Sequence, residues 1–115
     1  MQISILGVPY TLRYLTEAED AYLKDRDGYC DFSVRCCVVR DYTPEERNEA
    51  GALRDLDVYR RKVMRHEIVH AFLHESGLSV NAEKSDSWAD NEEMVDWFAI
   101  QGPKIFAVWQ QAGCL

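Results

Sequence analysis

Residues 63–77 read VMRHEIVHAFLHESG, and this stretch decides both the expected fold and the expected chemistry. Apolar residues recur at helical spacing from residue 53 to residue 75, and they occupy several sides of the helix. The sequence Ser76-Gly77-Leu78 is typical of a helix end, because glycine accepts the left-handed conformation that closes the last turn. We therefore expect one long, central and largely buried helix here.

All three histidines of the chain lie in that helix, and two of them belong to a His-Glu-x-x-His sequence. His66 and His70 are one turn apart on one face, where two imidazoles can bind one zinc ion at about 2.0–2.1 Å each. Glu67 projects from nearly the same face, at a position suited to contact a metal-bound water. Zinc lowers the pKa of such a water toward about 7, and a carboxylate can then take its proton. The pattern predicts a hydrolytic zinc site with Glu67 as general base.

A third ligand is expected from the next helix rather than from the remaining histidine. His74 lies eight residues after His66, about 12 Å along the helix axis, so the two cannot reach one ion and His74 is predicted to lie at the rim. Glu92 can complete a His₂Glu ligand set that leaves one coordination position open. Asp96, one turn after Glu92, can accept a hydrogen bond from the free ring N–H of a ligand histidine.

Glu93 is the alternative third ligand. We rank it second because we expect it to act as the capping-box partner of Asp90 at the start of this helix. Trp97, not an acid, also stands one turn after it. Acidic residues are favoured at any helix N-terminus, so a purely structural role of Glu92 and Glu93 is the alternative to ligation.

The residues before the long helix predict a small sheet. Two short β-prone runs, at 3–6 and 10–15, are separated by Gly-Val-Pro and predict two tightly joined strands, and two more strands are expected at 28–32 and 34–40. Thr-Pro-Glu-Glu at 43–46 is typical of a helix start, and Gly-Pro at 102–103 predicts a kink or break in the C-terminal helix.

These elements predict an α+β fold. We expect a single domain over residues 1–115, in which a small antiparallel N-terminal sheet packs on the central His-Glu-x-x-His helix and on a C-terminal helix.

Composition excludes several classes of function. The chain has 115 residues, of which 20 are acidic and 13 basic, and the net charge of −7 argues against binding to a nucleic-acid backbone. No apolar run approaches the roughly 18–20 residues of a membrane span. The first residues have no basic leader, so we expect no signal peptide and a cytoplasmic location. The four cysteines, Cys30, Cys36, Cys37 and Cys114, are then expected to be reduced and structural.

The two helical motifs resemble those of a known family. His66-Glu67-x-x-His70 followed by Glu92-x-x-x-Asp96 looks like the gluzincin pattern of thermolysin-type peptidases. The longer stretches 66–78 and 92–99, together with the Gly-x-Pro-Tyr-x-Leu opening at 7–12, resemble small phage- and prophage-encoded zinc metallopeptidases related to the ImmA/IrrE group. The resemblance implies a minimal zincin-like fold, with His66, His70 and Glu92 as zinc ligands and Glu67 as base. It further implies that an edge strand aligns the substrate, and 34–40 is the expected strand.

We therefore expect a zinc-dependent metallopeptidase, encoded by a phage or mobile element, that acts on a regulatory protein in a bacterial cytoplasm. Peptide hydrolysis also needs a donor to the developing oxyanion, for which Tyr29, Tyr59 or an arginine is a candidate. Because the sequence does not single out that donor, a non-catalytic zincin-fold module that binds a partner protein, with a structural or vestigial zinc, is the alternative.

Overall fold

The sheet of the protein is mixed rather than antiparallel. The computed structural model describes residues 1–81, 87–112 and 114–115. Its four strands are β1 (Gln2–Ile5), β2 (Val8–Leu15), β3 (Gly28–Asp31) and β4 (Cys36–Arg40), arranged in the order β1-β2-β4-β3. The β1–β2 and β3–β4 pairs are antiparallel, whereas β2 and β4 are parallel. The α+β class is confirmed, and the expectation of an antiparallel sheet is wrong.

The burial of β4 explains this order. Cys37, Val38 and Val39 are consecutive and each at most 2% exposed, so both faces of this strand are covered. A continuous apolar run is typical of a strand in the interior of a sheet, paired on both sides. The segment 34–40 is therefore not the edge strand that we expected. The edges of the sheet are β1 and β3.

The first two α-helices of the chain begin at side-chain caps. Thr43 accepts a hydrogen bond from the backbone N–H of Glu46 at 3.2 Å and starts the short helix α1 (Pro44–Arg47), as predicted. The long helix α2 (Leu56–Glu75) begins at Asp55, whose carboxylate accepts from the N–H of Val58 at 3.0 Å, a few residues later than expected. Gly77, with φ of +85°, follows the end of α2 in the left-handed conformation that the sequence predicted.

The third helix, α3 (Glu92–Ala112), starts differently from the prediction. Its first turn is capped by Asn91, whose side-chain oxygen accepts from the N–H of Met94 at 2.9 Å. Asp90 belongs instead to a short 3-10 turn, η2 (Trp88–Asp90), and accepts a hydrogen bond from Ser79. Asn91 is the better cap because it directly precedes the first residue of α3, so its side-chain oxygen lies over the free N–H groups of the first turn.

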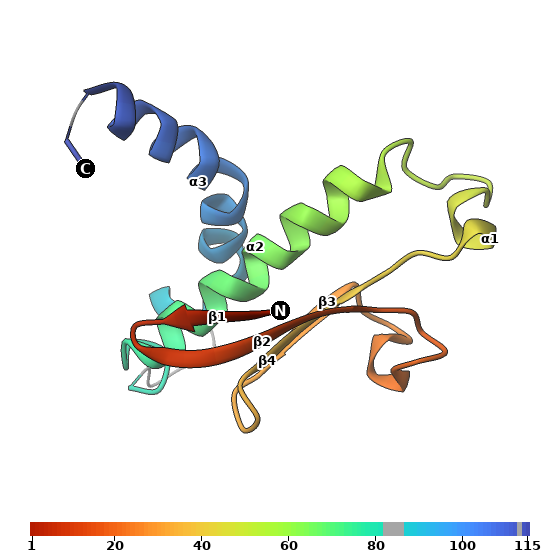
Figure 1. The fold of residues 1–115 in the computed structure, drawn as a ribbon, viewed down its shortest axis with the longest axis horizontal. Coiled ribbons are helices and arrows are strands. Elements are labelled where there is room, and N and C mark those ends of the chain that lie inside the picture. The colour runs from red at the N-terminus through yellow and green to blue at the C-terminus, as the bar shows by residue number, and fades with distance from the viewer. Residues whose placement is uncertain (82–86, 113) are drawn as a thin grey trace.

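Pro103 lies inside α3, which continues past it to Ala112 and bends along its length (Figure 1). The Gly-Pro pair therefore does not break the helix in two. In the part of the chain that the structure describes, no helix is long and apolar enough to cross a membrane.

Two apolar clusters hold the layers together. Helix α2 lies over one face of the sheet (Figure 1), and the main core between them contains Ile5, Tyr10, Cys37, Val39, Val63, Met64 and Ala71. A smaller cluster joins the C-terminal half of α2 to η2 and the start of α3; it contains Leu73, Ala89 and Val95. Helix α2 is thus packed on the sheet on one side and on α3 on another, which sets the positions of its polar residues.

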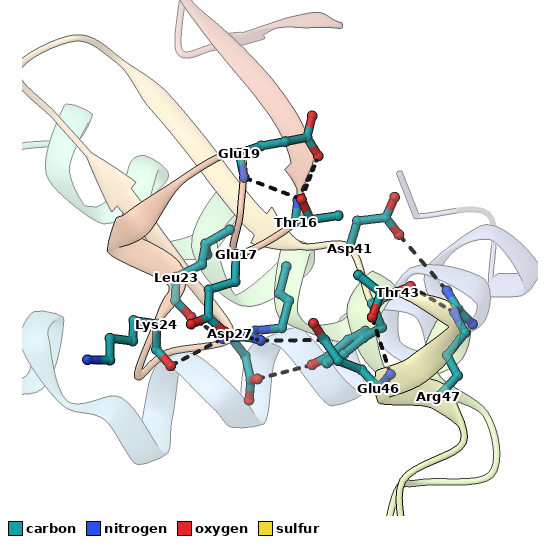
Figure 2. Close-up of polar contacts among 12 residues, drawn as sticks. Thr16, Glu17, Glu19, Leu23, Lys24, Asp27, Asp41, Thr43, Glu46 and Arg47 are labelled. Carbon is teal, nitrogen blue, oxygen red and sulfur yellow. Dashed lines mark hydrogen bonds and ion pairs between the residues drawn. The ribbon is translucent and has the colours of Figure 1, made fainter.

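A half-buried arginine fixes the segment that leads into β3. Arg40, at the end of β4, donates to the backbone carbonyls of Leu23 and Lys24 and forms ion pairs with Glu17 and Glu46 at 3.2 and 3.5 Å. Figure 2 shows these four partners converging from the 3-10 turn η1 (Ala21–Leu23), its preceding loop and α1. Since only four residues separate η1 from β3, this network also anchors the segment that leads into the edge strand.

Candidate metal centre

Three polar residues of α2 lie at the junction of the sheet, α2 and α3. The side chains of His66 and His70 are 17% and 19% exposed, and Glu67 is 7% exposed as a residue. Helical spacing places the two imidazoles one turn apart on the side of α2 that faces the first turn of α3. Glu67 is turned toward the sheet instead. The site is therefore half-buried on its histidine side and deeply buried at the glutamate.

Three potential ligand atoms converge at this junction. The Nε2 atom of His66 lies 3.0 Å from one carboxylate oxygen of Glu92, and Nε2 of His70 lies 3.1 Å from the other. The two Nε2 atoms are 3.1 Å apart. Three ligands bound to one zinc ion at about 2.0–2.1 Å in tetrahedral geometry stand about 3.3 Å from each other, so this triangle is close to the size that zinc requires.

Asp96 fixes the orientation of the His66 ring. Its Oδ1 atom lies 3.1 Å from Nδ1 of His66 and accepts a second, 2.6 Å ion pair from Nζ of Lys62. Burial opposes ionisation of Asp96, but the hydrogen bonds from Lys62 and His66 outweigh it and lower the pKa of the carboxyl. Because the ionised Asp96 accepts a hydrogen bond from Nδ1–H of His66, the proton of the neutral imidazole stays on Nδ1 and Nε2 is left with a free lone pair.

That lone pair explains why the cluster favours a cation. A neutral His66 with its proton on Nδ1 presents an acceptor toward the carboxylate of Glu92 and toward His70. Burial lowers the pKa of His70, which favours its neutral, ligating form. Acceptors at 3.0–3.1 Å repel each other unless a proton or a metal ion lies between them. Two imidazoles and one carboxylate also form the ligand set that hydrolytic zinc prefers. The residues present therefore fit a zinc ion.

Glu67 has the properties of a general base. Its pKa is raised to about 7, chiefly because burial disfavours the charged form and secondarily because the charge of Glu92 lies near, while Arg26 opposes the shift. A proton acceptor works best at neutral pH when its pKa is close to 7. The carboxyl therefore can both take up and release a proton at that pH.

Gly28, at the start of the edge strand β3, allows the backbone to approach Glu67. A Cβ atom at this position would stand 2.9 Å from Cγ1 of Val63, 3.0 Å from the carbonyl oxygen of Val38 and 3.3 Å from Oε1 of Glu67. Such contacts are too close for a side chain. Only glycine lets β3 run this close to the glutamate.

A cavity of about 190 Å³ opens beside Glu67 and His66, and Gly28, Tyr59 and Lys62 contribute to its wall. This space lies next to the ligand cluster, and its wall also includes the charged side chains of Asp27 and Asp96.

The two tyrosines considered as oxyanion donors both have carboxylate partners. Tyr59 donates to Asp27 at 2.6 Å, and burial together with this hydrogen bond raises the pKa of its hydroxyl to about 12. Tyr29 donates to Asp20 at 2.5 Å. Tyr59 lines the cavity beside Glu67, whereas Tyr29 lines a separate depression on the other side of β3. Tyr59 is thus the better placed of the two, although its proton points to Asp27.

The remaining predicted residues lie away from the cluster. Glu93, the alternative ligand, lines a groove with Trp88 and Trp97 rather than facing the histidines. The ring of His74 stacks on that of Phe32, with centroids 4.0 Å apart and planes nearly parallel. The position at the rim that the helix spacing predicted for His74 is consistent with this contact.

The cysteines are free, and two of them face each other in the core. Cys30 of β3 and Cys37 of β4 are direct partners in the sheet, and their Sγ atoms are 3.5 Å apart. The hydrogen bond with the Cys37 thiol, together with burial, raises the pKa of Cys30, so Cys30 is present as a thiol. Their contacts are those of packing residues beneath α2.

Sequence reasoning missed two residues of the site. Lys62 is one turn before His66 on the same helix face, so helical spacing alone indicates that it can reach the partner of His66. Gly28 had no such signal, because its importance comes from the approach of β3 to α2, two elements distant in the sequence.

Comparisons with known proteins add no relative to this picture. No known family model matches the chain. No curated protein and no solved structure matches it either. The function is therefore argued from the site.

Proposed function

We propose that the protein is a zinc-dependent metallopeptidase with a minimal zincin-like fold. The observation on which this rests is the convergence of the two Nε2 atoms of His66 and His70 with the carboxylate of Glu92 at 3.0–3.1 Å, beside a buried Glu67. Three protein ligands with one solvent-facing position are typical of catalytic rather than structural zinc. Glu92 is 69% exposed in its side chain, which leaves that side of the cluster open.

The residues of the site have distinct roles in this proposal. Zinc bound by His66, His70 and Glu92 would polarise the scissile carbonyl and acidify water. Glu67 accepts the proton of the attacking water and passes it to the leaving amine, for which its pKa of about 7 is suited. Asp96 keeps the proton of His66 on Nδ1 and so keeps Nε2 free for the ion.

The proposed substrate is a protein or peptide that lies along β3. This strand replaces 34–40 as the candidate, because β3 is an edge of the sheet and begins at Gly28, against the carboxyl of Glu67. An extended peptide can pair with such an edge through backbone hydrogen bonds. The family resemblance of the two helical motifs extends the proposal to a regulatory protein in a bacterial cytoplasm.

A second candidate function is a non-catalytic zincin-fold module that binds a partner protein. The hydroxyls of Tyr29 and Tyr59 both donate to carboxylates, and this observation favours it. An enzyme needs a donor aimed at the oxyanion, and Tyr59 can supply one only by leaving Asp27. In the module, zinc would stabilise the junction of α2 and α3 without turnover.

One experiment separates these candidates. The purified protein is analysed for metal content and then incubated, zinc-loaded, with a mixture of unstructured peptides whose cleavage is followed by mass spectrometry. The enzyme predicts about one zinc per chain and cleavage that Glu67→Gln abolishes while zinc remains bound. His74→Gln is the matched control, because it removes an imidazole from the same helix without touching the cluster. Stoichiometric zinc with no cleavage supports the module, and the absence of bound zinc contradicts both.

A further inference from the structure

Helix α3 bears a regular apolar stripe. Val95, Phe98, Gly102, Ile105 and Trp109 are spaced by three, four, three and four residues, so they lie along one side of the helix. This spacing is the one by which two helices pack along their length. The stripe passes from the metal-site end of α3 to its C-terminal end.

Only the first part of this stripe is covered within the chain. Val95 is completely buried against α2, and the neighbouring Ala99 is 1% exposed. Further along, Phe98 is 41% exposed, Gly102 and Ile105 are partly exposed, and Trp109 is 50% exposed, as is the flanking Phe106. Figure 1 shows the reason, since α3 bends away from α2 toward its C-terminal end. The same stripe thus begins as an interface with α2 and continues into solvent.

The apolar surface does not stop at α3. An entirely apolar depression next to Phe98 is lined by Phe72 and Leu73 of α2, Trp88 of η2 and Met94 of α3. Phe72 and Trp88 are 42% and 59% exposed. Surface of this kind, continuous over three elements, marks an interaction site rather than scattered exposed side chains.

Charge indicates what can cover this surface. From Trp97 to Leu115 the sequence contains a single charged side chain, Lys104, although the whole chain has a net charge of −7. The residues that flank the stripe, Ala99, Gln101 and Phe106, are uncharged. In paired helices these flanking positions select or reject partners through their charges. Here nothing repels an identical helix, even though the rest of two such acidic chains would repel each other.

The exposed area matches that of a dimer interface. An aromatic side chain buries about 150–250 Å², so the half-exposed Phe72, Trp88, Phe98, Phe106 and Trp109 together present roughly 500 Å² of apolar surface. A standard interface buries about 800 Å² on each partner, of which a little over half is apolar. The exposed apolar area of these side chains therefore agrees with the apolar area that one partner buries in a standard interface.

We propose that two copies of this chain form a two-fold dimer in which the stripe of one α3 packs on that of the other. A two-fold axis requires one self-complementary patch, and an uncharged helical stripe of this length provides it. The bend of α3, a helix that contains Pro103, contributes by carrying its C-terminal part clear of α2, where a second copy can reach it. This dimer does not depend on metal or on peptidase activity.

Sedimentation velocity over 1–100 µM protein tests the proposal, with Trp109→Glu as the variant. We expect the unchanged protein to sediment as a dimer at the higher concentrations and Trp109→Glu to weaken dimerisation by about 30-fold or more, as for an interface hot spot. Ile100→Glu is the matched control, because Ile100 is 41% exposed on the same helix but lies on the side opposite the stripe. A monomer at 100 µM overturns the proposal, and so does equal weakening by the two variants.

A second variant, with measurements of folding, distinguishes loss of the interface from loss of the fold. Ile105→Glu introduces a charge in the middle of the stripe and should also give a monomer. The far-UV circular dichroism of each variant is recorded, and zinc binding by equilibrium dialysis is compared with that of the unchanged protein. A monomeric variant with unaltered helix content and zinc affinity supports the stripe as the interface. If Ile105→Glu folds and remains dimeric, the interface lies elsewhere and the proposal is wrong.

Discussion

The ring of His66 is held by Asp96, whose Oδ1 atom lies 3.1 Å from the Nδ1 atom of the imidazole. This contact joins α2 to α3 at the centre of the candidate site, and Lys62 completes it with a 2.6 Å ion pair to the same oxygen. Because Asp96 determines which ring nitrogen bears the proton, it determines whether Nε2 can bind a metal ion. The orientation of this candidate ligand is therefore set by a residue outside the cluster of His66, His70 and Glu92.

Asp96→Asn should weaken zinc binding about 10- to 100-fold. The neutral amide accepts the Nδ1–H bond less strongly and loses the ion pair with Lys62, so the ring of His66 is less firmly held. Competition with a fluorescent chelator measures the affinity. Asp57→Asn is the control, since it removes a carboxylate that is paired with Arg47 at the other end of α2. Equal affinity of the two variants would show that Asp96 does not orient the ligand.

Glu67 should make the metal-free protein less stable as the pH rises. Its pKa is about 7 in the folded chain and close to 4.5 when unfolded, so the folded state binds the proton more tightly. The stabilisation is complete below pH 4.5 and is lost as the pH rises through 7. Glu67→Gln does not titrate, so at pH 8 it should be more stable than the unchanged protein by up to about 3 kcal/mol, with little difference at pH 5. Urea unfolding of the metal-free proteins at both values measures this. A difference independent of pH would contradict the burial of an ionisable Glu67.

The features that sequence predicted well are local ones. Spacing along one element predicts the helix across 56–75, its glycine end and the shared helix face of His66 and His70. The spacing of Glu92 and Asp96 likewise places both on one side of α3, and the structure brings that side to the histidines. What remained open was which of two adjacent acids faces them, because that depends on the rotation of α3 set by the burial of Val95.

The order of the sheet could not be predicted in the same way. Pairing of β4 with β2 joins segments that are separated by the whole of β3, and strand propensity does not say which neighbour a strand chooses. One sequence signal does indicate the place of β4 in the sheet. Cys37, Val38 and Val39 form an unbroken apolar run, which indicates an interior strand rather than an edge. The contact between Gly28 and Glu67 follows from that order and was out of reach without it.

Gly28→Ala should destabilise the protein by about 1–3 kcal/mol, the usual cost of forcing a methyl group into a packed interior. The added Cβ would meet Val63, the backbone of Val38 and Glu67 at 2.9–3.3 Å, and none of these can easily move. Gly102→Ala is the control, because an added Cβ at that position in α3 meets no atom beyond its neighbours along the helix; the helix propensity of alanine and its crowding by the following Pro103 oppose each other, so the stability should change little. Urea unfolding measures both changes. Unchanged stability of Gly28→Ala would mean that β3 does not lie against α2 this closely.

Glu92→Gln and Glu93→Gln differ by one position and should differ widely in zinc binding. Glu92 contacts both histidines through its two carboxylate oxygens, so its loss should lower the zinc affinity by more than about 100-fold, beyond the cost of losing an outer partner such as Asp96. Glu93 lines the groove beside Trp97, so its loss should change the affinity little.

Both variants remove one negative charge from the first turn of α3, which makes them equal in their effect on the helix dipole. Zinc also stabilises the folded chain by mass action, so a zinc concentration that saturates Glu93→Gln should raise its melting temperature by more than that of Glu92→Gln. Thermal unfolding with and without a chelator measures this difference, and the reverse order of the two variants would assign the third ligand to Glu93.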